Sequence, residues 1–162
     1  EYGITATQAL LRLPEPPDAI FCMSDTIAAG AVRALADAGY VETAYRMFTQ
    51  PEYPGWIHWL RQGATTLWGN WHGEASRNHI MFGDVAAWSF RYLGGLAPDE
   101  DAPGFSKVTL RPNPVPQLEF FNMCHETPCG RIEVRWTNRD GEFRVDAKAP
   151  EGVECKLELP EK

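Results

Sequence analysis

Cysteine and basic residues are both scarce in this sequence. Its 162 residues include four cysteines, at positions 22, 124, 129 and 155. So few cysteines do not form a disulfide scaffold, and we expect free thiols in a reducing, cytoplasmic compartment. Lys and Arg number 15 against 22 Asp and Glu, which gives a net charge of −7. Without a cluster of Lys and Arg there is no surface suited to a phosphate backbone, so no nucleic-acid partner is expected.

Long apolar runs are also missing. No run approaches the roughly 18 residues that cross a bilayer, and no signal peptide opens the chain, so no membrane partner is expected. The chain starts at Glu1 rather than at a methionine, as an internal piece of a longer protein would. With 44% hydrophobic residues the chain can bury a core, in one domain or two small ones.

Three segments differ in their patterns. Residues 1–40 predict a short α/β fragment: a helix over 7–13, a buried strand over 19–23, and a helix that Ser24 caps and Gly39 ends. Residues 41–97 predict the helices 41–48, 56–62 and 76–93, the last capped by Ser76, with a loop over 64–75. Eleven of the 19 aromatic residues and five of the six tryptophans lie between Tyr45 and Tyr92.

Residues 98–162 change to period-two alternation, which places one face of a strand in a core and the other in water. The alternating runs begin at Ile132, Phe143 and Val153, and two further strands are predicted over 107–111 and 118–124. Asp140-Gly141 is a typical hairpin turn between the first two runs. The chain is therefore predicted to be α+β, ending in a small antiparallel β-sandwich domain in which Val153, Cys155, Leu157 and Leu159 face inward.

The densest group of chemically capable residues lies between Thr65 and His79. It combines two tryptophans, two histidines, amides and one carboxylate, Glu74. Sugars bind to such mixtures, because flat apolar rings stack on their C–H faces and polar groups bond their hydroxyls. A carboxylate at such a site suits a general acid or base. The alternative is that the tryptophans are core residues at a helix junction and Glu74 is solvated.

Two other sets contain metal-ligand residue types. They are His72, Glu74 and His79, and Cys124, His125 and Cys129. Neither set has a recognised two-plus-two spacing, so we expect no metal and no cofactor.

Several sequence blocks resemble the bacterial α-L-rhamnosidases of glycoside hydrolase family 78. The resemblance covers about residues 39–160 and is carried by the blocks 44–50, 53–56, 62–68, 78–83, 102–105, 111–112 and 126–132. It implies the C-terminal helices of an (α/α)6 toroid over 41–97, followed by the β-sandwich domain over 98–162. It further implies inverting hydrolysis of terminal α-L-rhamnose by two carboxylates, one acting as acid and one as base.

The resemblance also implies which residues contact the substrate, and that the general base is missing. Substrate contacts would come from Trp56, Trp68, Trp71, Asn78 and His79, with rhamnose-containing glycosides as ligands. The family's general base follows the tryptophan of a Thr-Thr-Leu-Trp-Glu block, but here Gly69 stands at that place. Glu74 would be the substitute base, and the general acid would lie upstream of the matching region. We therefore expect this chain alone to be inactive, and a homo-oligomer or a missing catalytic portion to cover its helices.

Residues 1–40 resemble a different family, the sugar-binding domain of lactose-repressor-type regulators. Residues 17–25 and 28–31 carry this resemblance, which implies that Asp25 holds an effector; a role in stabilising the helix N-terminus is the alternative. The competing function is thus a non-enzymatic sugar-binding module of a transcription regulator. The two resemblances meet near residues 34–40, which would be the junction of two gene fragments. A third interpretation is that neither half binds a ligand.

Overall fold

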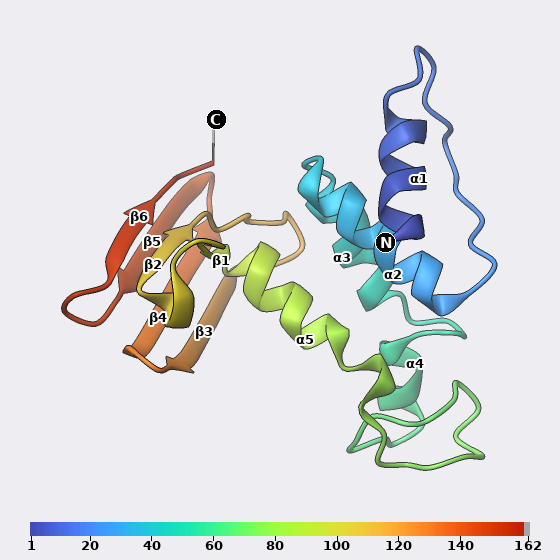
Figure 1. Ribbon diagram of the computed structural model, residues 1–162. Coiled ribbons are helices and arrows are strands. Elements are labelled where there is room, and N and C mark those ends of the chain that lie inside the picture. The colour runs from blue at the N-terminus through green and yellow to red at the C-terminus, as the bar shows by residue number, and fades with distance from the viewer. Residues whose placement is uncertain (161–162) are drawn as a thin grey trace. The chain divides into compact units, whose positions relative to one another are not determined.

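The computed structural model describes residues 1–160, except for the side chains of Asp25 and Met81. The chain forms two compact units, Glu1–Ile80 and Met81–Lys162, here called unit 1 and unit 2. Unit 1 is helical in its regular elements, and unit 2 contains the strands (Figure 1). The predicted α+β class is therefore confirmed.

Unit 1 contains four α-helices. They are α1 (Tyr2–Leu11), α2 (Asp25–Asp37), α3 (Val41–Thr49) and α4 (Trp56–Arg61). The hydroxyl of Ser24 accepts a bond from the backbone N–H of Ile27 and caps α2 as predicted, at 3.4 Å. Helices α1 and α2 cross closely where Gly3 of α1 meets Gly30 of α2. A Cβ on Gly3 would lie 2.3 Å from the carbonyl oxygen of Ile27. A side chain at Gly3 would force the helices apart.

The strand predicted over 19–23 is wrong. These residues form no regular element, and Phe21 and Met23 are 91% and 87% exposed. A buried strand needs neighbours that share its hydrogen bonds. The described residues of unit 1 form no other strand with which this apolar run could pair.

The helix predicted over 76–93 is wrong in its first half. The chain instead forms a 3-10 turn, η1 (Ile80–Phe82), then α5 (Asp84–Trp88) and a π-helical turn, η2 (Ser89–Leu93). The hydroxyl of Ser76 bonds with Asn78 rather than capping a helix. Two main-chain hydrogen bonds, from Gly69 to Ser76 and from His79 to Leu67, hold this stretch out of a helix.

The described residues of unit 2, 81–160, form six strands in two three-stranded sheets. The strands are β1 (Leu96–Pro98), β2 (Lys107–Leu110), β3 (Phe120–Thr127), β4 (Gly130–Arg139), β5 (Glu142–Lys148) and β6 (Glu154–Leu157), with a 3-10 turn, η3, over Pro103–Phe105. The sheet orders are β1-β2-β6 and β3-β4-β5. Every pair is antiparallel except β2 with β6, which is parallel. The predicted hairpin turn is confirmed, since Asp140 and Gly141 both have positive φ, at 53° and 77°.

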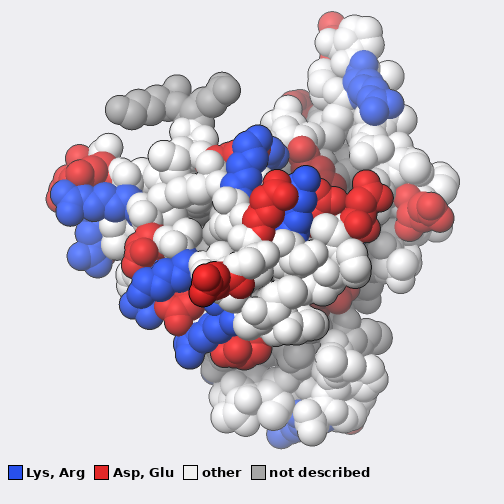
Figure 2. Space-filling view, turned by 60° about the vertical axis from the view of Figure 1, so that its left-hand side comes forward, with Lys and Arg blue, Asp and Glu red and all other residues white. Residues whose placement is uncertain are grey.

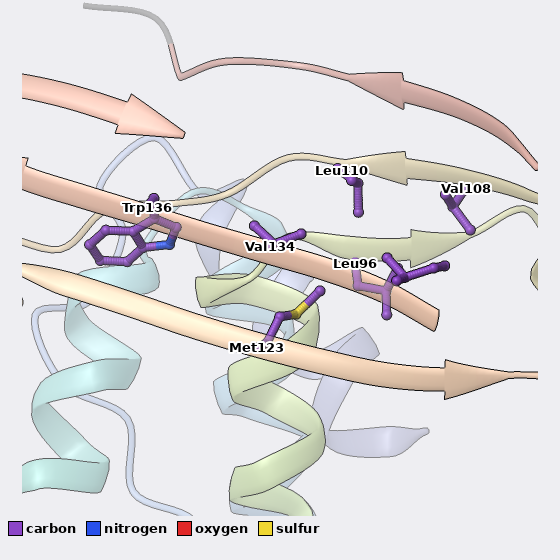
Figure 3. Close-up of a cluster of buried hydrophobic side chains, with 7 residues drawn as sticks. Leu96, Val108, Leu110, Met123, Val134 and Trp136 are labelled. Atoms are coloured by element: carbon purple, nitrogen blue, oxygen red, sulfur yellow. The ribbon is translucent and has the colours of Figure 1, made fainter. Parts of the chain in front are cut away.

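The core of unit 2 lies between the two sheets. It consists of Leu96, Val108, Leu110, Met123, Ile132, Val134 and Trp136, each no more than 6% exposed (Figure 3). The indole Nε1 of Trp136 donates to the carbonyl oxygen of Leu93 at 2.8 Å, so the end of η2 is bonded to this core. Asn113 likewise donates to the carbonyl oxygen of Tyr92 at 2.8 Å. These side chains satisfy carbonyls at the end of the helical segment.

The inward face predicted for the last strand is wrong for most of its length. Only Val153 packs against the core, while Leu157 and Leu159 are 43% and 58% exposed and Cys155 is exposed. Strand β6 is the edge of its sheet, and the core reaches only its beginning.

Figure 2 shows Lys and Arg beside Asp and Glu over the strands of this unit. Lys107, for example, lies 3.3 Å from Asp99 and 3.6 Å from Glu154.

Candidate functional site

Four tryptophans of unit 1 form one cluster, the tryptophan cluster, made of Trp56, Trp59, Trp68 and Trp71. Trp59 is its centre: it is 2% exposed, and its ring lies 4.5 Å from Trp71 and 5.8 Å from Trp68. Its Nε1 donates to the carbonyl oxygen of Trp71 at 3.0 Å. Trp56 lies edge-on to Trp71 at 5.1 Å. Helix α4 therefore holds the loop that follows it through aromatic contacts.

The loop of residues 64–79 is closed by hydrogen bonds. The backbone N–H of Gly69 donates to Ser76 at 2.7 Å, and that of His79 donates to Leu67 at 2.8 Å. The side-chain oxygen of Asn70 accepts from the N–H groups of Gly73 and Glu74, at 2.9 and 3.2 Å. These bonds satisfy backbone groups that a loop would otherwise leave to water, and they fix its path.

Trp68 occupies a core position in this loop. It is 7% exposed, with the guanidinium of Arg77 5.2 Å from its ring centroid. Gly73 approaches the same ring: its φ is +73°, and a Cβ there would lie 2.4 Å from Cζ3 of Trp68. For Trp68 the arrangement therefore matches the alternative of a packed core residue. Trp56 and Trp71 are half-buried and keep part of their rings at the surface.

The polar residues predicted for the site all lie at the surface of this loop. Glu74, Asn78 and His79 are exposed. Gly69 faces His79, since a Cβ on Gly69 would lie 3.5 Å from Cδ2 of the imidazole. The φ of Gly69 lies outside the left-handed region, but a Cβ there would lie 3.3 Å from the carbonyl oxygen of Ser76, so a side chain at this position is tightly packed. The role of Glu74 as a substitute base stays a prediction.

Neither of the two sets of metal-ligand residue types comes together in a cluster. Within residues 1–160, no three His, Cys, Asp or Glu side chains gather closely enough to hold a metal ion. His72 instead bonds to Tyr53, at 2.9 Å between Nε2 and the phenol oxygen. The side chain of Asp25, the predicted effector contact, lies outside the described residues.

Two open depressions lie on unit 2. One holds about 640 Å³ and is lined by residues 117–122; the other holds about 390 Å³ and is lined by Glu119 and residues 138–140. None of the residues predicted to contact sugar lines either of them.

Among the described residues, no helix has both the length and the apolar character needed to span a membrane.

Helices that carry clustered tryptophans, followed by two packed β-sheets, define the class of this chain as a helical segment with an appended β domain. Residues 28–93 match the bacterial alpha-L-rhamnosidase 6 hairpin glycosidase domain. Residues 95–162 match the bacterial alpha-L-rhamnosidase C-terminal domain. The chain belongs to the bacterial α-L-rhamnosidase family, which confirms the resemblance. Helices α3, α4 and α5 lie within the residues that match the six-hairpin domain, and α1 lies outside them.

Known proteins show the same relationship. The chain is 28% identical over 137 residues to an alpha-L-rhamnosidase of Alteromonas sp. (strain LOR), which covers 78% of this chain and 15% of that protein. The crystal structure of Streptomyces avermitilis alpha-L-rhamnosidase complexed with L-rhamnose is 26% identical, with a TM-score of 0.71 over 78% of this chain and 13% of that one. The chain thus spans only a small fraction of the length of these relatives.

A second, short similarity leads to a transcription regulator. Over 45 residues the chain is 49% identical to the HTH-type transcriptional repressor PurR of Actinobacillus pleuropneumoniae, which covers 28% of this chain and 13% of that protein. This match is weak support for the regulator resemblance of residues 1–40. The glycosidase match begins at residue 28, within α2.

Proposed function

We propose that this chain contributes to the sugar-binding site of an α-L-rhamnosidase, and that alone it binds terminal L-rhamnose without hydrolysing the glycoside. The observation that carries the proposal is the hydrogen-bonded loop 64–79, in which Glu74, Asn78 and His79 are exposed and Trp71 is half-buried. The ring offers a face for the C–H groups of a sugar, and the exposed polar groups suit its hydroxyls. The loop lies within the segment that matches the glycosidase domain.

The number of carboxylates supports the absence of hydrolysis. Inverting glycosidases use two, one as general acid and one as general base on opposite sides of the scissile bond. The loop 64–79 contains one carboxylate, Glu74, and has Gly69 where the family resemblance implies the base. Glu74 can fill at most one of the two roles, so binding survives while turnover is lost.

A binding experiment with matched carboxylate variants tests the proposal. Titration of the full chain with L-rhamnose, followed by calorimetry, is expected to show weak saturable binding. His79→Ala and Glu74→Gln should each weaken it roughly threefold or more, the effect of one lost hydrogen bond. Glu52→Gln removes another exposed carboxylate of unit 1, outside the loop, and should leave the affinity unchanged. No saturable binding, or equal affinity in all four proteins, would contradict the proposal.

The 45-residue similarity to PurR favours a second candidate, a sugar-responsive module of a transcription regulator. In that case binding of the sugar would depend on Asp25 and not on the loop 64–79. Asp25→Asn would then abolish binding, whereas His79→Ala would leave it intact.

A further inference from the structure

Two exposed aromatic side chains of unit 1, Tyr53 and His72, form a hydrogen-bonded pair. Tyr53 precedes α4 and His72 follows it, yet their rings stack at 4.9 Å with an interplanar angle of 29°. The phenol oxygen of Tyr53 lies 2.9 Å from Nε2 of His72. His58 of α4 adds a third ring, edge-on to Tyr53 at 5.6 Å. Three separate parts of the chain thus meet in one aromatic arrangement.

Both members of the pair are held in place by the backbone around them. The side-chain amide of Gln50 donates to the carbonyl oxygen of Pro54 at 2.5 Å, which closes the turn that carries Tyr53. On the other side, the carbonyl of Trp71 accepts from Trp59, and the turn over 70–74 is closed by Asn70. Tyr53 nevertheless remains 48% exposed, and His72 is exposed. The pair is therefore an oriented surface feature and not part of a core.

The pair continues the tryptophan cluster along the same two chain segments. Segment 53–56 supplies Tyr53 and Trp56, and segment 71–72 supplies Trp71 and His72. Trp56 meets Trp71 at 5.1 Å, just as Tyr53 meets His72 at 4.9 Å. Both aromatic pairs are therefore formed between the same two chain segments, and a ligand bound at Trp71 has the Tyr53–His72 pair at the next residue of the chain.

We propose that Tyr53 and His72 form a second sugar subsite, which binds the neutral pyranose to which the terminal rhamnose is linked. This inference rests on the proposed function, since it extends the same site. The part of the Tyr53 ring that His72 and His58 leave exposed supplies an apolar surface on which a pyranose stacks. The phenol oxygen and the ring nitrogens of His72 supply hydrogen-bonding groups at its edge. The ligand class is uncharged because the pair carries no carboxylate or guanidinium.

The test compares two ligands on the full chain: methyl α-L-rhamnoside, and the methyl glucoside that carries an α-1,6-linked L-rhamnose. We expect the disaccharide to bind roughly three- to tenfold more tightly than the monosaccharide, the gain from one stacked ring. Tyr53→Ala and His72→Ala should reduce this ratio to about one. Tyr53→Phe keeps the ring and loses only the hydroxyl, so it should retain most of the ratio. Tyr40→Ala is the matched control, because Tyr40 is a similarly exposed tyrosine of unit 1, at 51%.

The outcomes separate this inference from the proposed function. Equal affinities of the native chain for the two ligands, or a ratio that survives Tyr53→Ala in a folded protein, would overturn the second subsite alone. Binding of neither ligand would overturn the proposed function and the subsite together. Circular dichroism of each variant shows whether the fold is kept, and Tyr53→Phe provides the comparison if Tyr53→Ala does not fold.

Discussion

Units 1 and 2 bury their apolar side chains to different extents. In unit 2, Leu110, Ile132 and Val134 are completely buried between two sheets that the unit itself provides. In unit 1, the tryptophan cluster is packed, but Phe21, Leu60 and Ile80 are 91%, 62% and 85% exposed. A β-sandwich closes its core with its own strands, whereas a few helices taken from a larger helical domain leave apolar faces uncovered. Cover by a second copy or by further helices stays a prediction.

Two leucines, one in each unit, give the sharpest test of this difference. Leu110→Ala in β2 should lower the free energy of unfolding by roughly 2–5 kcal/mol, because it leaves a cavity in a closed core. Leu60→Ala in α4 should change it by less than about 0.5 kcal/mol, since that side chain is already in water. Urea denaturation followed by circular dichroism measures both. Similar losses for the two variants would mean that α4 is covered in solution, for example in an oligomer.

Two glycines with positive φ test how tightly the tryptophan cluster is packed. Gly63 has a φ of +80°, and a Cβ added there would have no atom within 4 Å. Gly63→Ala should therefore lower the free energy of unfolding by only about 1 kcal/mol, through backbone strain. Gly73→Ala has a similar φ but places its Cβ against the ring of Trp68. It should cost roughly 1–3 kcal/mol more, because the ring must move. Thermal melts followed by tryptophan fluorescence compare the two, and equal melting temperatures would show that the cluster is loose.

Local signals in the sequence predicted much of the fold. The cap at Ser24, the period-two runs of β4 and β5, and the Asp140-Gly141 turn each act within a few residues, so their structure does not depend on distant neighbours. The failures have tertiary causes. Residues 19–23 are apolar but lack a partner strand, and residues 76–79 pair with 67–69 instead of entering a helix.

The site was predictable in composition but not in arrangement. The concentration of Trp, His and Glu predicted that the loop is a candidate site, but it did not predict which ring is buried. That depends on the contacts of Trp68 with Gly73, in the turn over 70–74, and with Arg77, which follows the turn. The Tyr53–His72 pair joins residues 19 apart, across α4, and its spacing gives no sign of contact. The spacing of Trp59, three residues after Trp56 on one helix, was only a weak indication that it belongs to the tryptophan cluster.

The smallest expected effect concerns a surface carboxylate of unit 2. A bond from the backbone N–H of Asp101, followed by one from Lys107, lowers the pKa of Asp99 below its usual value. A lowered pKa in the folded state adds stability above the usual pKa of about 3.9, and this is lost as the pH falls through the folded value. The fall in melting temperature between pH 7 and pH 3 should therefore be slightly smaller for Asp99→Asn than for the native chain. Asp101→Asn keeps its backbone donor and should behave like the native chain; equal falls in all three would contradict the contribution of Asp99.

Hydrolysis of 4-nitrophenyl α-L-rhamnoside by the purified chain tests the proposed function most directly. Nitrophenolate is a leaving group that needs little help from a general acid, so the assay reports mainly on whether a base is present. We expect no release above the rate in buffer, because Gly69 supplies no carboxylate at the position where the family resemblance implies the base. Measurable release that disappears in Glu74→Gln would contradict the proposal and identify Glu74 as a working base.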